Sequence, residues 1–320
     1  MACNSRQHGV KNSGHICPSS KFCFAELLLH RRRYMKCPAQ TRATGVCPMF
    51  TFDSICDRPC LRKRHLRIET MIEAVRSYRE QDLTIPFDNV QYHVTYAPVG
   101  NYPTEPLVII SGKTTSGDSS DLFKRNLVDT GDLYFSCVTS IFSNMKNRLF
   151  VYLNKIGLFD YLRKRLAYWD NDDYRSKWDR IFTDPKTSSE SGIQMTQAFN
   201  CAILNRDRRT RSSQPPKKVF NAIQREFGCL FKHFRITDSL RLIIFLDTPG
   251  SPGSFHQIDY WKKVMEDNDN LYNVISITHP SAQNSIIYDN LDNLEQIETR
   301  KKEKAIRLLD VARRTVQSLP

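Results

Sequence analysis

The segment 106-PLVIISG-112 is a run of apolar, mostly β-branched residues that ends in a glycine. Such a run is typical of a strand that is buried on both faces, as the strands of parallel sheets are. Three later segments are also predicted as strands: 193-IQMTQAFNCAIL-204, 240-LRLIIFLD-247 and 273–277. The sequence therefore predicts four buried strands.

Helical patterns separate these strands. Apolar residues recur at helical spacing over residues 144–168, with an interruption at Gly157, and helices are also predicted over 217–233, 257–266 and from 289 onward. Strands that alternate with helices predict a three-layer α/β/α domain around a central, mainly parallel four-stranded sheet. Ligands of such sheets bind at the carboxyl ends of the strands, so we expect Gly112, Gln197 and His279 along one edge.

The first 65 residues differ from the rest of the chain. Residues 1–65 form a Cys-rich, basic N-terminal segment, and residues 66–320 form the α/β domain, which begins with a helical pattern over 66–82. The N-terminus has no apolar segment of the signal-peptide type, which predicts a cytoplasmic protein. Clustered cysteines in such a protein favour metal or iron–sulfur ligands over disulfides, with ordinary thiols as the alternative for several of them.

The charge of the chain indicates a polyanionic partner. Lys and Arg number 47 against 34 Asp and Glu, which gives a formal net charge of +13 and an isoelectric point near 9.3. Such an excess favours nucleic acid, although a merely basic surface is the alternative. No run approaches the roughly eighteen apolar residues that a membrane span needs. We therefore expect a nucleic acid and no membrane among its partners, and we expect a monomer.

Two segments resemble parts of a nucleotide hydrolase. Gly112-Lys113 follows one predicted strand and Asp247 ends another. A phosphate loop needs a glycine five residues before the Gly-Lys pair, and that position is Leu107, inside the strand. The two segments also lie far apart in the sequence, which argues against one nucleotide site. We therefore expect no nucleotide cofactor.

Taken in order, the strand-end motifs resemble the uracil-DNA glycosylase superfamily, closest to its iron–sulfur branch and its less characterised bacterial members. The resemblance extends over about residues 95–290. The segments that carry it are 107-LVIISGKTTSG-117, 154-NKIGL-158, 196-TQAFNCAILNRD-207, 240-LRLIIFLDTPGSPG-253 and 277-ITHPSAQN-284. The resemblance implies a DNA glycosylase, which removes a deaminated or modified base after flipping it out of the duplex.

The resemblance also implies roles for individual residues. His279 would donate a hydrogen bond to the departing base, with a histidine that only closes a turn as the alternative. Relatives carry Asp, Asn or Glu shortly after the glycine of the first motif, whereas this chain has Thr114 to hold water and Asp118 as the nearest carboxylate. The base-binding residues would be Gly112, Gln197, Asn200 and Phe142, and the alternative for Phe142 is an ordinary place in the core. The DNA-binding residues would be Ser281, Asn284, Arg206, Arg208 and Arg209.

A cofactor is implied in the same way. Cys56, Cys60, Cys201 and Cys229 correspond to the four ligands of a 4Fe-4S cluster, although three residues separate the first two where two are expected. Zinc is the second possibility. Because Thr114 is a weak substitute for a carboxylate, the alternative function is a non-catalytic nucleic-acid-binding protein of the same fold.

Overall fold

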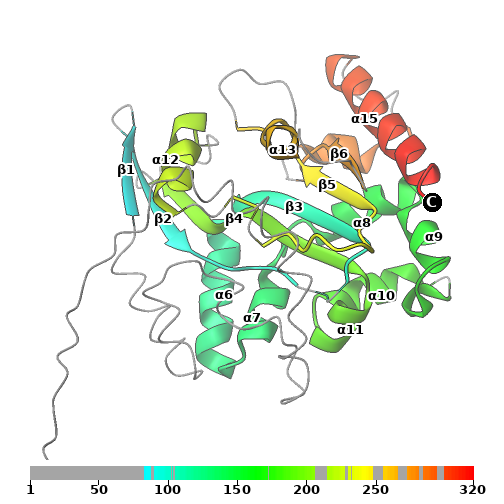
Figure 1. Cartoon of the computed structure of the whole chain (residues 1–320), viewed down its shortest axis with the longest axis horizontal. Coiled ribbons are helices and arrows are strands. Elements are labelled where there is room, and N and C mark those ends of the chain that lie inside the picture. The colour runs from blue at the N-terminus through cyan, green and yellow to red at the C-terminus, as the bar shows by residue number, and fades with distance from the viewer. Residues whose placement is uncertain are drawn as a thin grey trace, which may run out of the picture.

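The structure is a computed structural model, shown in Figure 1. It describes residues 83–87, 90–101, 103, 105–171, 173–205, 215–227, 230–231, 233–247, 255–265, 272–280, 284–293 and 299–320. The Cys-rich segment 1–65 and the helix expected over 66–82 lie outside the described residues.

A mixed sheet forms the centre of the described part of the chain. Its strands lie in the order β1-β2-β4-β3-β5-β6, and β4, β3, β5 and β6 run parallel to one another. The strands are β1 (Leu83–Phe87), β2 (Val90–Tyr96), β3 (Val108–Thr115), β4 (Ile193–Asn205), β5 (Leu242–Leu246) and β6 (Asn273–Ile277).

Helices cover both faces of the sheet, which confirms the α/β class (Figure 1). Two separate apolar clusters lie on the two faces: β5 contributes Ile244 to one and Ile243 to the other, as alternate residues of a strand must. Two helices pack on the smaller cluster, α12 (Lys217–Phe227) and α13 (Gln257–Met265). The helices that pack on the larger cluster are α6 (Gly117–Thr130), α7 (Leu133–Ser140), α8 (Lys146–Lys155), α9 (Leu158–Arg163), α10 (Tyr174–Ile181), α14 (Ser285–Asp289) and α15 (Thr299–Gln317). The short α11 (Pro185–Glu190) and a 3-10 turn, η2 (Ala167–Trp169), complete the helices described.

The prediction of a four-stranded sheet is wrong in its count, because the described residues form six strands. The four predicted strands are the parallel part, and β1 and β2 extend it: β2 pairs antiparallel with β4, and β1 with β2. In a four-stranded sheet β4 would be an edge strand with unpaired backbone groups. Its pairing with β2 supplies hydrogen-bond partners for these groups. The sheet is therefore mostly parallel with an antiparallel addition at one side.

The helix boundaries follow local sequence signals. α8 and α9 are separate helices because Gly157 lies between them with a φ of 79°, a left-handed conformation that glycine adopts at little cost. α12 ends at Phe227, earlier than the expected 233. Among the described helices, none is long and apolar enough to cross a membrane.

Candidate functional site

His279 lies at the carboxyl edge of the parallel strands. β6 ends at Ile277, and His279 follows two residues later, where the sequence places it, with its side chain half-buried. The Asn284 side chain donates to the main-chain carbonyl of His279 at 2.8 Å, and the Tyr288 hydroxyl donates to the carbonyl of Thr278. These bonds hold the turn, so the structure gives Asn284 a local role in positioning the histidine.

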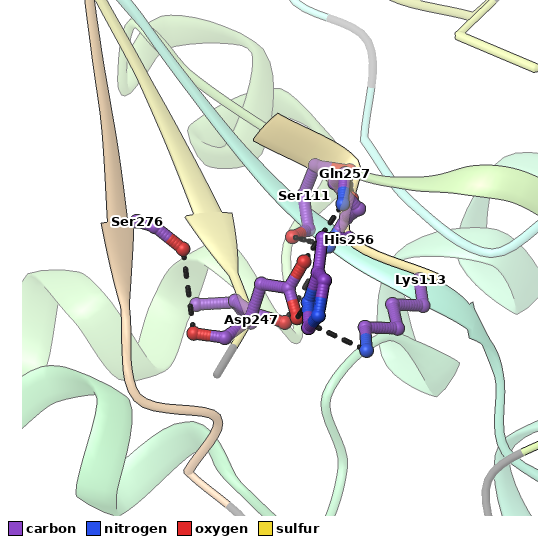
Figure 2. Close-up of polar contacts among 7 residues, drawn as sticks. Ser111, Lys113, Asp247, His256, Gln257 and Ser276 are labelled. Carbon is purple, nitrogen blue, oxygen red and sulfur yellow. Dashed lines mark hydrogen bonds and ion pairs between the residues drawn. The ribbon is translucent and has the colours of Figure 1, made fainter. Parts of the chain in front are cut away.

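A buried ion pair joins the ends of the two neighbouring strands β3 and β5. Lys113 Nζ lies 3.0 Å from Asp247 Oδ1; the aspartate side chain is fully buried and the lysine side chain is 11% exposed (Figure 2). Asp247 also fixes the end of β5 to β6, because its N–H donates to Ile277 O and its carbonyl accepts from Ser276 Oγ. A charge buried in this way needs compensation, and Lys113 supplies it.

The start of α13 supplies further partners to the same carboxylate. The Gln257 N–H, in the first turn of α13, donates to Asp247 Oδ2 at 2.7 Å, as expected where a helix N-terminus faces an anion. His256 Nδ1 lies 3.4 Å from Asp247 Oδ1. The Gln257 side chain accepts from Ser111 Oγ at 2.8 Å and so binds α13 to β3. Figure 2 shows Lys113 from β3 and His256 from the start of α13 directed at Asp247, with Ser111 and Gln257 bonded to each other nearby.

The electrostatics of His279 follow from this neighbourhood. Burial, which disfavours the charged imidazole, lowers the pKa of His279 to about 4; the positive charge of Lys113 acts in the same direction and Asp247 opposes it. His279 is therefore neutral at neutral pH and can donate one N–H hydrogen bond without carrying a charge. We call Lys113, Asp247, His256 and His279 the ionisable cluster.

The prediction that Lys113 and Asp247 belong to different sites because they are far apart in the sequence is wrong. β3 and β5 are parallel neighbours, so their carboxyl ends meet and the two side chains form an ion pair. β3 runs from Val108 to Thr115, so Gly112 and Lys113 lie within this strand, and Ser116 caps α6 immediately afterwards.

The residues expected to read the base lie on the other side of β3. Gln197 pairs with Gly112 in the parallel ladder and is 4% exposed. With its nitrogen turned toward β3, the Gln197 amide donates to the carbonyls of Gly112 at 3.3 Å and Thr114 at 3.2 Å. A Cβ at Gly112 would come within 2.2 Å of this amide. Gly112 thus makes room for Gln197, and Thr114 is a half-buried strand residue.

The remaining expected residues of the described chain come from different elements. Asn200 is buried in β4, and its main-chain carbonyl accepts from the Ala97 N–H. Phe142 is 2% exposed in the larger apolar cluster, which agrees with the core alternative for this ring. Asp118 is exposed in the first turn of α6 and accepts a hydrogen bond from Asn144 at 3.3 Å.

Several expected residues cannot be placed. Of the four cysteines assigned to the cluster, Cys201 lies within the described chain, buried in the smaller apolar cluster opposite Tyr96 of β2. No group of three or more His, Cys, Asp and Glu suited to a metal ion occurs among the residues that the structure describes. Ser281, Arg206, Arg208, Arg209, Cys56, Cys60 and Cys229 lie outside the described residues.

Sequence reasoning missed three members of the ionisable cluster as site residues: Lys113, Asp247 and His256. A signal existed for Asp247, because it is the charged residue that ends the apolar run 242–246 at the carboxyl edge of a predicted parallel strand. Lys113 is likewise a charged residue near the carboxyl end of a predicted parallel strand, directly after Gly112 on β3. His256 carried no comparable signal, since it is brought to the edge by the start of α13.

Comparison with known proteins adds no relative. Neither a family model, nor a curated protein, nor a solved structure matched this chain.

Proposed function

We propose that this protein is a DNA glycosylase that hydrolyses the N-glycosidic bond of a flipped-out deaminated or modified base. The observation that carries the proposal is the Lys113–Asp247 ion pair at the carboxyl edge of a mostly parallel sheet, with His279 just after the adjacent strand β6 and its pKa lowered by burial. The resemblance of the strand-end motifs to the uracil-DNA glycosylase superfamily supports the same reaction. DNA as the partner is supported by the net charge of +13.

His279 would stabilise the departing base. Breaking the bond between the base and the sugar leaves negative charge on a base oxygen. A neutral imidazole N–H that points at this oxygen binds it more strongly in the transition state than in the ground state, which accelerates the reaction. The low pKa of His279 means that it donates this bond as a neutral group over the whole physiological pH range.

Lys113 and Asp247 would supply the two charges that this reaction needs. The sugar becomes cation-like as the bond breaks, and the base becomes anion-like. The Lys113 ammonium can stabilise the base, and the negative charge of the buried Asp247 carboxylate can stabilise the sugar. The carboxylate that relatives carry near Thr114 would therefore come from β5 in this chain.

The finer parts of the proposal rest on sequence. Ser281 and Asn284 would contact DNA together with the basic segment that contains Arg206, Arg208 and Arg209. A 4Fe-4S cluster would be held by Cys56, Cys60, Cys201 and Cys229 as thiolates, with a structural role near the DNA-binding loop. Iron and sulfide analysis of anaerobically purified protein tests it: the cluster proposal fails if zinc or no metal is found.

One observation favours the alternative, a nucleic-acid-binding protein without catalysis. The Gln197 amide, which should read the base, is directed at the main chain of β3. A base would have to displace these bonds or be read by other groups. Under this alternative, the ionisable cluster would stabilise the edge of the sheet and bind phosphates.

A substrate panel distinguishes the two functions. Duplex and single-stranded oligonucleotides that carry uracil, hypoxanthine, xanthine or a modified cytosine are incubated with the protein, and alkali-labile abasic sites are counted. We expect one of these bases to be released by the parent protein and not by His279→Ala, while both proteins bind DNA equally. If no base is released and binding is equal, the glycosylase proposal is wrong and the binding protein remains.

A further inference from the structure

A cavity of about 410 Å³ lies between the turn that joins α8 to α9 and the C-terminal end of α15. Its volume is within the range of roughly 300 to 1,000 Å³ that is usual for pockets that bind small organic molecules. The residues that line it include the buried apolar residues Ile156, Val316 and Leu319 and the exposed amides Asn154 and Gln317. The cavity therefore offers a ligand both apolar and polar surface.

This cavity lies at the amino edge of the sheet, away from the ionisable cluster. Leu166 lies shortly after α9, and a Cβ on Gly192 would collide with its Cδ1 atom and lie 3.8 Å from Leu107 Cγ. Because Gly192 directly precedes β4 and Leu107 directly precedes β3, the end of α9 lies beside the amino ends of these strands. Figure 1 shows α9 and the C-terminus at the end of the sheet away from the arrowhead of β5. A ligand in this space, which we call the amino-edge cavity, would be separate from one at Asp247.

The charged residues that line the amino-edge cavity are mostly cations. Those among the described residues are Lys155, Lys164, Arg165 and Arg313, together with the carboxylate of Asp160. Asp160 already accepts a hydrogen bond from the Tyr174 hydroxyl at 2.9 Å. Part of the positive charge offsets the ends of α8, α9 and α15, because each helix C-terminus carries roughly half a negative charge, about 1.5 charges for the three. Four cations against one carboxylate exceed this amount, so the cavity favours an anion.

The acidic partners of two of these cations hold them only weakly. Lys155 pairs with Asp292, whose side chain is 85% exposed. Arg313 Nη1 lies 3.9 Å from Asp310 Oδ1, on the same face of α15. Because exposed ion pairs of this kind contribute little to stability, the phosphate oxygens of a ligand can compete with both carboxylates.

Arg165 gives the same cavity a planar surface. Its guanidinium lies over the ring of Tyr161, with 4.1 Å between the guanidinium carbon and the ring centroid. The Arg165 Nη1 atom also donates to the Tyr161 carbonyl at 3.4 Å, which holds the side chain in place. Tyr161 is buried and Arg165 is exposed, so the ring covers one face of the guanidinium and leaves the other to a ligand. The exposed face of an arginine held in this way can stack on a nucleobase.

We propose that the amino-edge cavity binds a free nucleoside triphosphate, with Lys155, Lys164 and Arg313 at its phosphates and Arg165 against its base. The volume, the excess of cations and the planar surface each match one part of such a ligand. Side-chain cations would here take the place of the backbone amides of a phosphate loop. The proposal does not depend on base removal, because these residues lie at the edge opposite the ionisable cluster.

Calorimetric titration of the full-length protein tests this proposal. ATP, GTP, CTP and UTP are titrated separately, and so is inorganic triphosphate, which has no base. We expect at least one of the nucleotides to bind at a single site. Arg313→Ala should weaken this binding by about tenfold or more, because a charged contact to phosphate is lost. Arg314→Ala is the matched control, since Arg314 is exposed on the same helix, donates to the Asp310 carbonyl and does not line the cavity.

A second variant separates stacking from charge. Arg165→Lys keeps the positive charge and removes the planar group, so the affinity for the nucleotide should fall by about fivefold or more. The affinity for inorganic triphosphate should stay the same. An unchanged affinity for the nucleotide would overturn the contact between Arg165 and the base.

The outcomes of the titrations are distinct. Nucleotide binding that is weakened in Arg313→Ala and retained in Arg314→Ala supports the proposal, whether or not a base is ever released from DNA. Absence of binding by all four nucleotides overturns it, and so do equal affinities in Arg313→Ala and Arg314→Ala. If a single-stranded oligonucleotide binds in a manner that depends on Arg313 while the free nucleotides do not bind, the cavity holds a nucleic acid strand and the proposal is wrong. Thermal unfolding without ligand shows whether lost binding reflects lost structure.

Discussion

The two halves of the sheet's carboxyl edge differ in how their polar side chains are satisfied. Between β3, β5 and β6, the buried Asp247 carboxylate lies 3.0 Å from Lys113 Nζ and 3.4 Å from His256 Nδ1, and both charges of the ion pair influence the pKa of His279. Between β3 and β4, the Gln197 amide turns back onto the main chain at Gly112 and Thr114. Both halves look equally suited to a ligand in the sequence. The two halves thus differ in the partners of their polar side chains: Lys113 pairs with the Asp247 side chain, whereas the Gln197 amide bonds to main-chain carbonyls of β3.

The largest expected effect concerns the charge at the centre of the cluster. Asp247→Asn leaves Lys113 without its buried counter-charge, so we expect the free energy of unfolding to fall by about 3 to 5 kcal/mol. Asp292→Asn removes the partner of Lys155 in an ion pair whose aspartate is 85% exposed, and should cost less than about 1 kcal/mol. Urea unfolding at neutral pH measures both. Equal losses would mean that burial does not distinguish the two pairs.

The second effect concerns the acid stability that His279 controls. The folded-state pKa of about 4 lies below the usual value of 6.5, so the unfolded chain binds a proton that the folded chain excludes. Stability is fully present above about pH 6.5 and is lost as the pH falls toward 4, by roughly 3 kcal/mol over this window. His279→Gln should remove this part of the slope, as measured by urea unfolding between pH 4 and 7. The charge of Lys113 also lowers this pKa and that of Asp247 raises it, and an unchanged slope would mean that burial does not hold His279 neutral.

The third effect tests the other half of the edge. Gly112→Ala places a Cβ 2.2 Å from the nearest atom of the Gln197 amide and 3.0 Å from its Cδ, so the amide must give up its bonds to β3. We expect a loss of about 1 to 2 kcal/mol in the free energy of unfolding. In a Gln197→Ala background, the same change should cost less, because the obstructing group is gone. Additive losses in this double-mutant cycle would show that Gln197 does not lie on Gly112.

The sequence predicts the parallel part of the fold because apolar runs rich in β-branched residues are typical of the buried strands of parallel sheets. The sequence also carries a signal for β2, where Tyr92 and Val94 are buried and alternate with Gln91 and His93, although the first strand predicted above is 106–112. The position of His279 follows from the end of β6 alone. The Lys113–Asp247 pair could not be deduced in this way, because it depends on β3 and β5 being neighbours.

The cluster also shows why residue type alone misleads at this edge. Asp118 is the carboxylate nearest to the first motif in the sequence, yet it lies exposed on α6. Asp247 is distant in the sequence, and neighbouring strands bring it to Lys113. Motif spacing along the chain finds groups on one element, whereas a site at the ends of parallel strands is assembled across elements.

The most direct test of the account is the single-turnover rate of base release, measured with the released base identified by the substrate panel. The account predicts that His279→Gln lowers this rate by roughly 10²- to 10³-fold at unchanged DNA affinity, as expected when a hydrogen bond to a developing anion is lost. Asp118→Asn should retain the rate of the parent protein, because its side chain bonds to Asn144 on the surface. A normal rate for His279→Gln, or an equal loss for Asp118→Asn, would contradict the account.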